Sequence, residues 1–194
     1  SSNVFTTGVW THDFAGTTDF AQLDDAGTDP VVTMNRFRRL LAKGSGFKPN
    51  TLVLGANVLD GLEVHPSLTE RIKYTQRAIL DAEILSSLFK IPNVITAESM
   101  VNMAPEDIST NGGEDFEYIM DENAMWLGYI EPTASMNSPT AIARFAWTGL
   151  IPGAMNQMGG VITRGRDSRA YSDWIHSRNA FDIKVTAPDL GLYF

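Results

Sequence analysis

The chain of 194 residues is the size of one large domain or two small ones, and its 43% hydrophobic residues can build a core, so a wholly disordered chain is excluded. Fifteen Lys and Arg against 23 Asp and Glu give a net charge of −8, which excludes a protein that grips nucleic acid through a basic face. The absence of cysteine excludes disulfides and thiolate metal sites, and no apolar run approaches the ~18 residues that cross a bilayer, so no membrane partner is expected.

The first stretch, residues 4–26, is rich in Thr, Gly and Asp without clear periodicity, so we expect extended chain and loop there. The clearest helix follows, because Asp29 is a good N-cap and Pro30 suits the first helical position. Gly44 and Gly46 are expected to end it. Its apolar residues recur at helical spacing and predict a buried face, on which an aspartate should be strongly destabilising: Val31, Met34, Phe37, Leu40 and Leu41.

Short strands and helices alternate in the next segment. His65-Pro66 ends a predicted helix over 57–62, and Pro92 ends a predicted helix over 77–90. The predicted elements are a strand over 51–54, a helix over 57–62, a helical turn opened by a capping box over 67–70, a helix over 77–90 and a strand over 93–96. Their order predicts helices packed on a sheet.

The second half of the chain is richer in turns and strands. Residues 104–121 contain Asn-Gly-Gly and, from Glu106 to Glu117, five acids, which predicts an exposed loop or hairpin. Residues 124–130 are strand-like, whereas the run from Pro139 through Trp147 fits a short helix or an edge strand. Residues 155–160 are expected to form a loop, and the repeated alternation over 161–194 predicts long β-strands.

The residues that most often carry catalysis are sparse. His12, His65 and His176 are far apart in sequence and form no metal-binding pair, and His65 precedes Pro66 in a turn, where a surface or capping role is favoured. Gly44-Ser45-Gly46 ends a helix and does not open one, so a C-cap and turn is favoured over a nucleophile elbow or a dinucleotide loop.

Two acidic clusters and one basic run are candidate binding sites. Asp24-Asp25 and the cluster from Glu114 to Glu117 lack the spacing of a calcium loop, so solvated acids are favoured over a cation site. The basic run, in so acidic a chain, favours an ion pair between subunits over DNA readout; it comprises Arg164, Arg166 and Arg169. We therefore predict no catalytic, cofactor-binding or metal-binding residues, no cofactor and no enzymatic activity.

A series of segments from Asp29 onward carries a resemblance to a known family. The segments are Asp29-Pro30 at the start of the long helix, 49–55, Leu62 through His65-Pro66 to 70–74, 85–89 followed by 92–97, 138–140, 145–147, 159–161, and 181–185 with 187–191. In this order and spacing they resemble the major capsid proteins of tailed bacteriophages, which have the Hong Kong 97-type shell fold.

The resemblance implies an α+β fold in two parts. A peripheral part would take residues 1–48, with the end of an extended loop and a long spine helix, and the long strands of 158–182. An axial part, a mixed sheet flanked by helices, would take 49–157, and the terminal strand in 183–194 would return to it. Family members carry an N-terminal arm and an extended loop before the spine helix. Because only 28 residues precede Asp29, we expect the arm and most of that loop to be absent, as in a fragment or a trimmed product.

The resemblance also implies a function. Such subunits are structural virion proteins that self-assemble into hexamers and pentamers and close an icosahedral head around double-stranded DNA. They are assembled in the host cytoplasm and reside in the virion. The implied partners are other copies of the chain, scaffold, portal and decoration proteins, and packaged DNA contacted non-specifically. Two alternatives stay open: a shell protein of a cellular nanocompartment or gene transfer agent, and a small α/β hydrolase-like enzyme using His65 or His176.

Overall fold

The structure is a computed structural model of the whole chain. It describes residues 4–15, 19–20, 22–23, 25–73, 82–103, 116–133, 135, 137–147, 149–150 and 160–194. The chain divides into two compact units, and each is described by itself. The larger unit comprises Phe5–Ala141 and Ala187–Phe194, and the smaller unit comprises Ser1–Val4 and Ile142–Thr186. Helices and strands are both present, so the predicted α+β class is confirmed.

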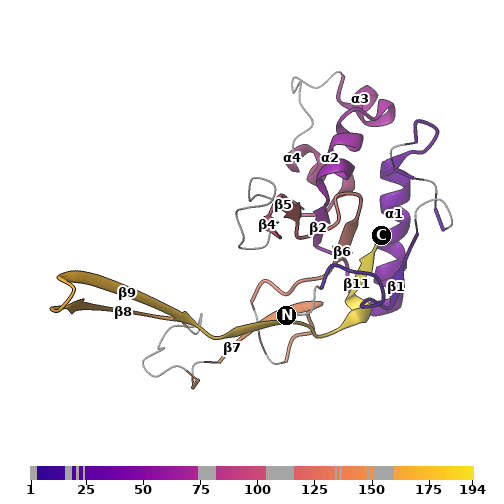
Figure 1. Ribbon diagram of the computed structural model, residues 1–194. Helices are drawn as coiled ribbons and strands as arrows, with labels where there is room; N and C mark the ends of the chain where they lie inside the picture. Colours follow the sequence, from indigo (N-terminus) through magenta and orange to yellow (C-terminus); the bar gives the residue numbers. More distant parts are fainter. Residues whose placement is uncertain are drawn as a thin grey trace. The chain divides into compact units, whose positions relative to one another are not determined.

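A five-stranded mixed sheet forms the centre of the larger unit (Figure 1). Its strands, in spatial order, are β1 (His12–Asp13), β11 (Gly191–Tyr193), β6 (Met125–Gly128), β2 (Thr51–Leu54) and β3 (Asn93–Thr96). The two outer pairs, β1–β11 and β2–β3, are parallel, whereas β6 runs antiparallel to both of its neighbours. The last residues of the chain thus lie in the same sheet as β2, which begins at residue 51.

One face of this sheet is covered by helices. They are α1 (Pro30–Ser45), α2 (Ala56–Glu63), α3 (Pro66–Ile72) and α4 (Ala82–Phe89), with the 3₁₀ helix η2 (Pro188–Leu190) before β11. The sheet residues that join the hydrophobic core with these helices alternate along their strands, as one face of a sheet requires: Leu52, Leu54, Met125, Leu127 and Leu192. The helices contribute apolar residues to the same core, among them Met34, Leu62, Leu68 and Leu85.

The opposite face of the sheet is closed by aromatic rings. Trp126 is fully buried, and its ring centroid lies 5.3 Å from that of Trp10 and 5.9 Å from that of Phe5. Gly191 has no room for a side chain, because a Cβ there would lie 2.4 Å from the Trp10 ring. Burial on both faces explains why β2 and β6 are continuous apolar or small-residue runs and do not alternate with polar residues.

The long helix α1 begins and ends as the sequence predicts. The Asp29 side chain accepts a hydrogen bond from the Val31 N–H, and Gly46 takes a left-handed conformation at φ 79°, which glycine adopts without strain. Two details of the prediction are wrong. Gly44 lies inside the helix, and Leu40 is 37% exposed, whereas Leu41 is only 2% exposed. The helix packs against the core through Met34, Phe37 and Leu41, so Leu40 lies at the edge of its buried face.

The predicted short elements behind α1 are mostly confirmed. The strands over 51–54 and 93–96 and the helix around 57–62 are present as β2, β3 and α2. The capping box at 67–70 is wrong, because α3 begins at Pro66 and is capped by His65. Of the helix predicted over 77–90, α4 accounts for the last part, and residues 77–81 lie outside the described residues.

A small antiparallel pair also belongs to the larger unit. It joins β4 (Met100–Asn102) to β5 (Phe116–Tyr118). Residues 104–115 of the predicted exposed loop or hairpin lie outside the described residues. Phe116, Glu117, Ile119 and Asp121 are exposed, as expected, whereas Met120 within the same segment is only 3% exposed.

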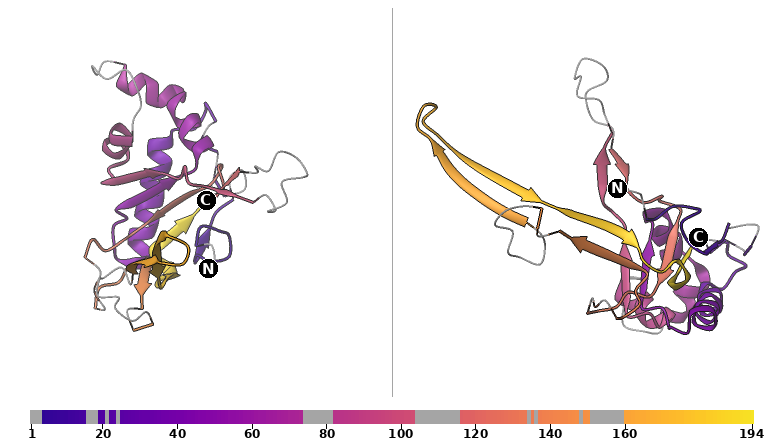
Figure 2. Two further views of the ribbon diagram at one scale, coloured as in Figure 1. Left: turned by 60° about the vertical axis from the view of Figure 1, so that its left-hand side comes forward. Right: turned by 90° about the horizontal axis from the view of Figure 1, so that it is seen from below.

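The smaller unit consists of two antiparallel ribbons. One pairs β7 (Ile142–Ala146) with β10 (Phe181–Val185), and the other pairs β8 (Gly160–Asp167) with β9 (Ser172–Asn179), which Figures 1 and 2 show as a long hairpin. The ambiguous run after Pro139 is therefore a strand. The long strands predicted after residue 161 are confirmed, whereas residues 155–159 lie outside the described residues. The division into peripheral and axial parts stays a prediction.

Candidate functional site

His65, which stands out in sequence through its His-Pro context, is a buried structural residue. Its Nδ1 accepts a hydrogen bond from the Ser67 N–H at 3.2 Å, and its Nε2 lies 3.0 Å from the Asp25 carbonyl oxygen, to which it donates. The ring therefore caps α3 and ties it to the loop before α1. The predicted capping role is confirmed, but a surface position is wrong, because His65 is 1% exposed.

The other two histidines lie on exposed strands. His12 in β1 stacks on Phe14, with ring centroids 6.2 Å apart. His176 in β9 has its Nδ1 3.4 Å from an Arg178 nitrogen. These two histidines belong to different units, and their ring partners are an aromatic ring and a guanidinium, neither of which is the carboxylate or hydroxyl of a catalytic pair.

Ser45 of the Gly-Ser-Gly motif serves the end of α1. Its hydroxyl donates to the Leu41 carbonyl at 2.7 Å and accepts from the Phe47 N–H at 3.2 Å. Both partners are backbone groups of the helix terminus and the turn after it. The prediction of a C-cap and turn is thus confirmed for this motif, with Gly46 as the capping residue.

The acidic residues of the described ranges do not converge on a cation site. No group of three or more His, Asp or Glu side chains in these ranges is placed to hold a metal ion. Asp25 Oδ1 accepts from the Gly27 N–H in a turn, while Asp24, Glu114 and Asp115 lie outside the described residues. Glu117 lies in β5 and lines a hollow of about 370 Å³ together with Asp121 and Glu122.

Two tyrosines of the larger unit have shifted pKa values. A hydrogen bond from the Tyr129 hydroxyl to Glu131, 2.6 Å long, raises the pKa of Tyr129, because the carboxylate favours the protonated phenol. Burial raises the pKa of Tyr193, and the negative charges of Asp121 and Asp13 raise it further. Both shifts keep the phenols neutral and give neither of them the character of a base.

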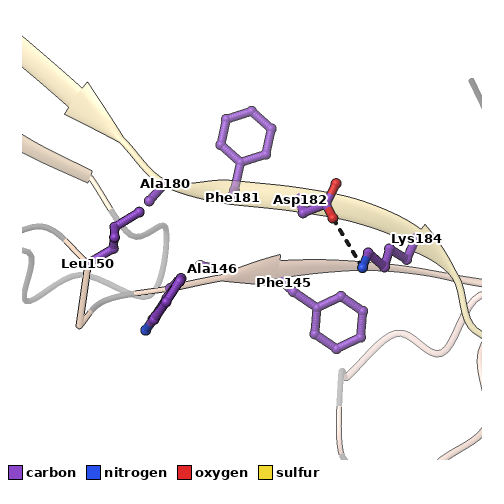
Figure 3. Close-up of a pocket in the computed structure, with 8 residues that line it drawn as sticks. Phe145, Ala146, Leu150, Ala180, Phe181, Asp182 and Lys184 are labelled. Carbon is purple, nitrogen blue, oxygen red and sulfur yellow. Dashed lines mark ion pairs between the residues drawn. The ribbon is translucent and has the colours of Figure 1, made fainter. Parts of the chain in front are cut away.

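A hollow of about 630 Å³ lies on the β7–β10 ribbon of the smaller unit (Figure 3). It is lined mainly by apolar side chains, including Phe145, Leu150 and Phe181. Figure 3 shows Phe145 and Phe181 pointing to opposite sides of the ribbon. Its charged members, Asp182 and Lys184, form an exposed ion pair of 3.5 Å. An open apolar surface of this kind is typical of a contact surface and lacks the convergent acid and base groups of an active site.

The predicted basic run falls on the β8–β9 ribbon. Arg164 and Arg166 lie in β8, whereas Arg169 lies in the turn that follows, where its N–H donates to Asp167. Strand β9 is exposed along its whole length and β8 along most of it. The sequence pattern identified these arginines but missed the apolar residues beside them, because only the strand register shows which residues share a face.

The described helices include none that is both long and apolar enough to span a bilayer.

Comparisons with known proteins show what this chain is similar to in sequence and in fold. No family model matches the chain. The chain is 33% identical over 75 residues to the major capsid protein of Burkholderia phage BcepMu, a match that covers 39% of this chain and 24% of the relative. The crystal structure of a phage-related protein from Bordetella bronchiseptica RB50 has a TM-score of 0.71 at 21% identity and covers 94% of this chain and 55% of that protein. A structure from Mycobacterium phage Che8 has a TM-score of 0.50 at 14% identity, over 94% of this chain and 52% of its own.

The chain covers only part of each of these proteins. The chain spans about a quarter of the length of the Burkholderia relative and about half of the two structures, as their covered shares of 24%, 55% and 52% indicate. The structural matches establish the fold, and the Burkholderia match adds similarity in sequence. The predicted resemblance is therefore confirmed: this α+β chain is similar in sequence to a phage major capsid protein.

Proposed function

We propose that this chain is a structural subunit of a phage capsid shell, whose copies self-assemble into hexamers and pentamers of an icosahedral head around double-stranded DNA. The observation that carries the proposal is the 33% identity over 75 residues to a protein named as a major capsid protein. The similarity of fold to phage proteins over 94% of the chain supports it.

The chemistry of the described residues supports a structural, non-enzymatic role. Both ring nitrogens of His65 are engaged with backbone groups, so this histidine is not free to exchange protons with a substrate. The smaller unit instead exposes several large apolar side chains, among them Phe145, Ile175 and Phe181, which suits contact between copies. A net charge of −8 further favours a shell wall along which packaged DNA slides, since like charges repel.

The proposed partners follow from this role. Other copies of the chain come first, and scaffold, portal and decoration proteins would add contacts to the shell. Packaged DNA would touch the chain only non-specifically. The protein would be assembled in the host cytoplasm and reside in the virion.

Assembly of the purified chain tests the proposal. Sedimentation velocity over a range of protein concentrations should reveal species far larger than the 21.3 kDa monomer. Negative-stain electron microscopy of those species should show rings or shells with fivefold or sixfold symmetry. A chain that stays a monomer at every concentration would contradict the proposal.

A matched control separates ordered assembly from aggregation. The Leu41→Asp variant places a charge in the core of the larger unit and should unfold. Large particles formed by this variant are amorphous aggregates, and ordered particles should form only from the parent chain. If parent and variant give the same amorphous material, self-assembly into a shell is contradicted.

A further inference from the structure

The β8–β9 ribbon leaves most of its own side chains exposed. All eight residues of β9 are exposed, and so are most of those of β8. An isolated two-stranded hairpin is marginally stable in water at best, because it buries too little apolar surface to offset the cost of ordering its backbone. A ribbon of eight paired positions therefore gains stability when another surface covers it.

The strand register assigns the ribbon's side chains to two faces. Ile162 lies opposite Ser177, Arg164 opposite Ile175, and Arg166 opposite Asp173, so these six residues share one face. The other face is partly filled by Trp174, whose ring lies over Gly165, where an added Cβ would be 2.4 Å from it. No described residue covers the first face, which we call the Ile–Arg face, in this way: Ile162 is 64% and Ile175 is 70% exposed.

The composition of the ribbon is that of a protein-binding surface. Residues 160–179 contain four Arg, one Trp and one Tyr, and they contain no Lys and no Glu. Interfaces between proteins are enriched in Arg, Trp and Tyr and depleted in Lys and Glu, because planar side chains bury large areas at a low cost in conformational entropy. Nucleic-acid binding would be served as well by Lys, which is absent from this segment.

The distribution of charge indicates which protein surface fits the ribbon. Residues 142–186 carry six basic and three acidic side chains, a net charge of +3. The rest of the chain carries nine basic and twenty acidic side chains, a net charge of −11. Opposite charges on two regions of one chain favour a head-to-tail contact between copies, in which the basic region of one meets the acidic region of the next.

We propose that the Ile–Arg face of the β8–β9 ribbon docks on the acidic larger unit of a second copy of this chain. Ile162 and Ile175 would supply apolar burial. Arg164 would pair with a carboxylate of the neighbour, and so would Arg166, which is now in an exposed 3.9 Å ion pair with Asp173 of its own ribbon. This inference rests on the proposed function and adds to it the surface through which neighbouring copies bind. The contact is heterologous, so each copy uses its ribbon and its larger unit at the same time.

Site-directed crosslinking tests this contact cleanly, because the chain has no cysteine. Ser177→Cys on the Ile–Arg face and Ser172→Cys on the opposite face are matched exposed positions of β9. Each variant is labelled with benzophenone maleimide, mixed with an equal amount of ¹⁵N-labelled parent chain, concentrated under assembling conditions, irradiated and digested for mass spectrometry. The isotope label distinguishes crosslinks between copies from crosslinks within one.

The proposal expects the Ser177→Cys label to join the ribbon of one copy to residues 5–141 or 187–194 of the other, with far fewer such products from the Ser172→Cys label. Reversing both charges with Arg164→Glu and Arg166→Glu should lower that yield about tenfold, whereas Arg164→Lys with Arg166→Lys should keep most of it. Crosslinks confined to one copy, crosslinks from ribbon to ribbon, or equal yields from both faces would overturn the proposal.

Three further outcomes separate this inference from its alternatives. If ordered particles form but the Ser177→Cys label maps elsewhere, the docking proposal fails and the capsid function stands. If the chain stays monomeric and gives no crosslink between copies, both fail. A gel shift with duplex DNA tests the remaining candidate partner: binding that the double Arg→Glu variant abolishes, with no effect on crosslinking, would assign the arginines to nucleic acid and overturn the proposal.

Discussion

Strands β6 and β9 show how differently the two units are built. All four residues of β6 are buried, between the helices on one face and the rings of Trp10 and Phe5 on the other. All eight residues of β9 are exposed, although they include Trp174 and Ile175. The larger unit thus has a core of its own. The strands of the smaller unit are ordered as pairs but have apolar side chains left to contact another molecule, which fits a subunit that is complete only in an assembly.

The strongest test of this difference lies in α1 of the larger unit. Leu41→Asp should destabilise the chain by about 3–5 kcal/mol, because it buries an unpaired charge and removes core packing. Leu40→Asp, one residue away and 37% exposed, should cost no more than about 1 kcal/mol. Urea unfolding followed by tryptophan fluorescence measures both. Equal losses at the two positions would contradict the assigned core face of the helix.

A smaller effect is expected at His65, which links two elements of the same unit. His65→Ala removes the cap of α3 and the contact to the Asp25 carbonyl, and it should cost about 2–3 kcal/mol. His65→Asn keeps an acceptor for the Ser67 N–H and should recover about 1 kcal/mol of that loss. The same urea titration applies, and an Asn variant no more stable than the Ala variant would show that capping is not what His65 contributes.

The features that the sequence predicted correctly are those fixed by local chemistry. Asp29, Pro30 and Gly46 delimit α1 through contacts within a few residues of the chain. Leu40 was misassigned because helical spacing defines a broad face, and only packing against the sheet separates its centre at Leu41 from its edge. For His65 a capping role was predicted only as an alternative to a surface position, since the usual caps are Ser, Thr, Asp and Asn and the competing pattern at Ser67 fits them better.

Features that depend on distant partners could not be predicted in the same way. The run 142–146 is a strand because it pairs with 181–185, and nothing within the run itself decides between helix and strand. For the candidate interface, the arginines were visible in sequence as a basic run. Their grouping with Ile162 and Ile175 depends on the hairpin register, which places Arg164 opposite Ile175.

The smallest expected effect gives the sharpest test of the difference between the larger and the smaller unit. Ile175→Ala in the free monomeric chain should change the free energy of unfolding by no more than about 0.5 kcal/mol, because the side chain is 70% exposed. Leu127→Ala, in a strand of the larger unit, should cost about 3 kcal/mol, since Leu127 is fully buried. Hydrogen exchange of the backbone amides reports each unit separately and should show faster exchange in β8 and β9 than in β2 and β6.

If the loss of unfolding free energy in Ile175→Ala matches the loss in Leu127→Ala, the ribbon is already covered in the free chain. The exposed Ile–Arg face would then not be available to a neighbour, whereas a silent Ile175→Ala that weakens crosslinking between copies places the role of this side chain in assembly.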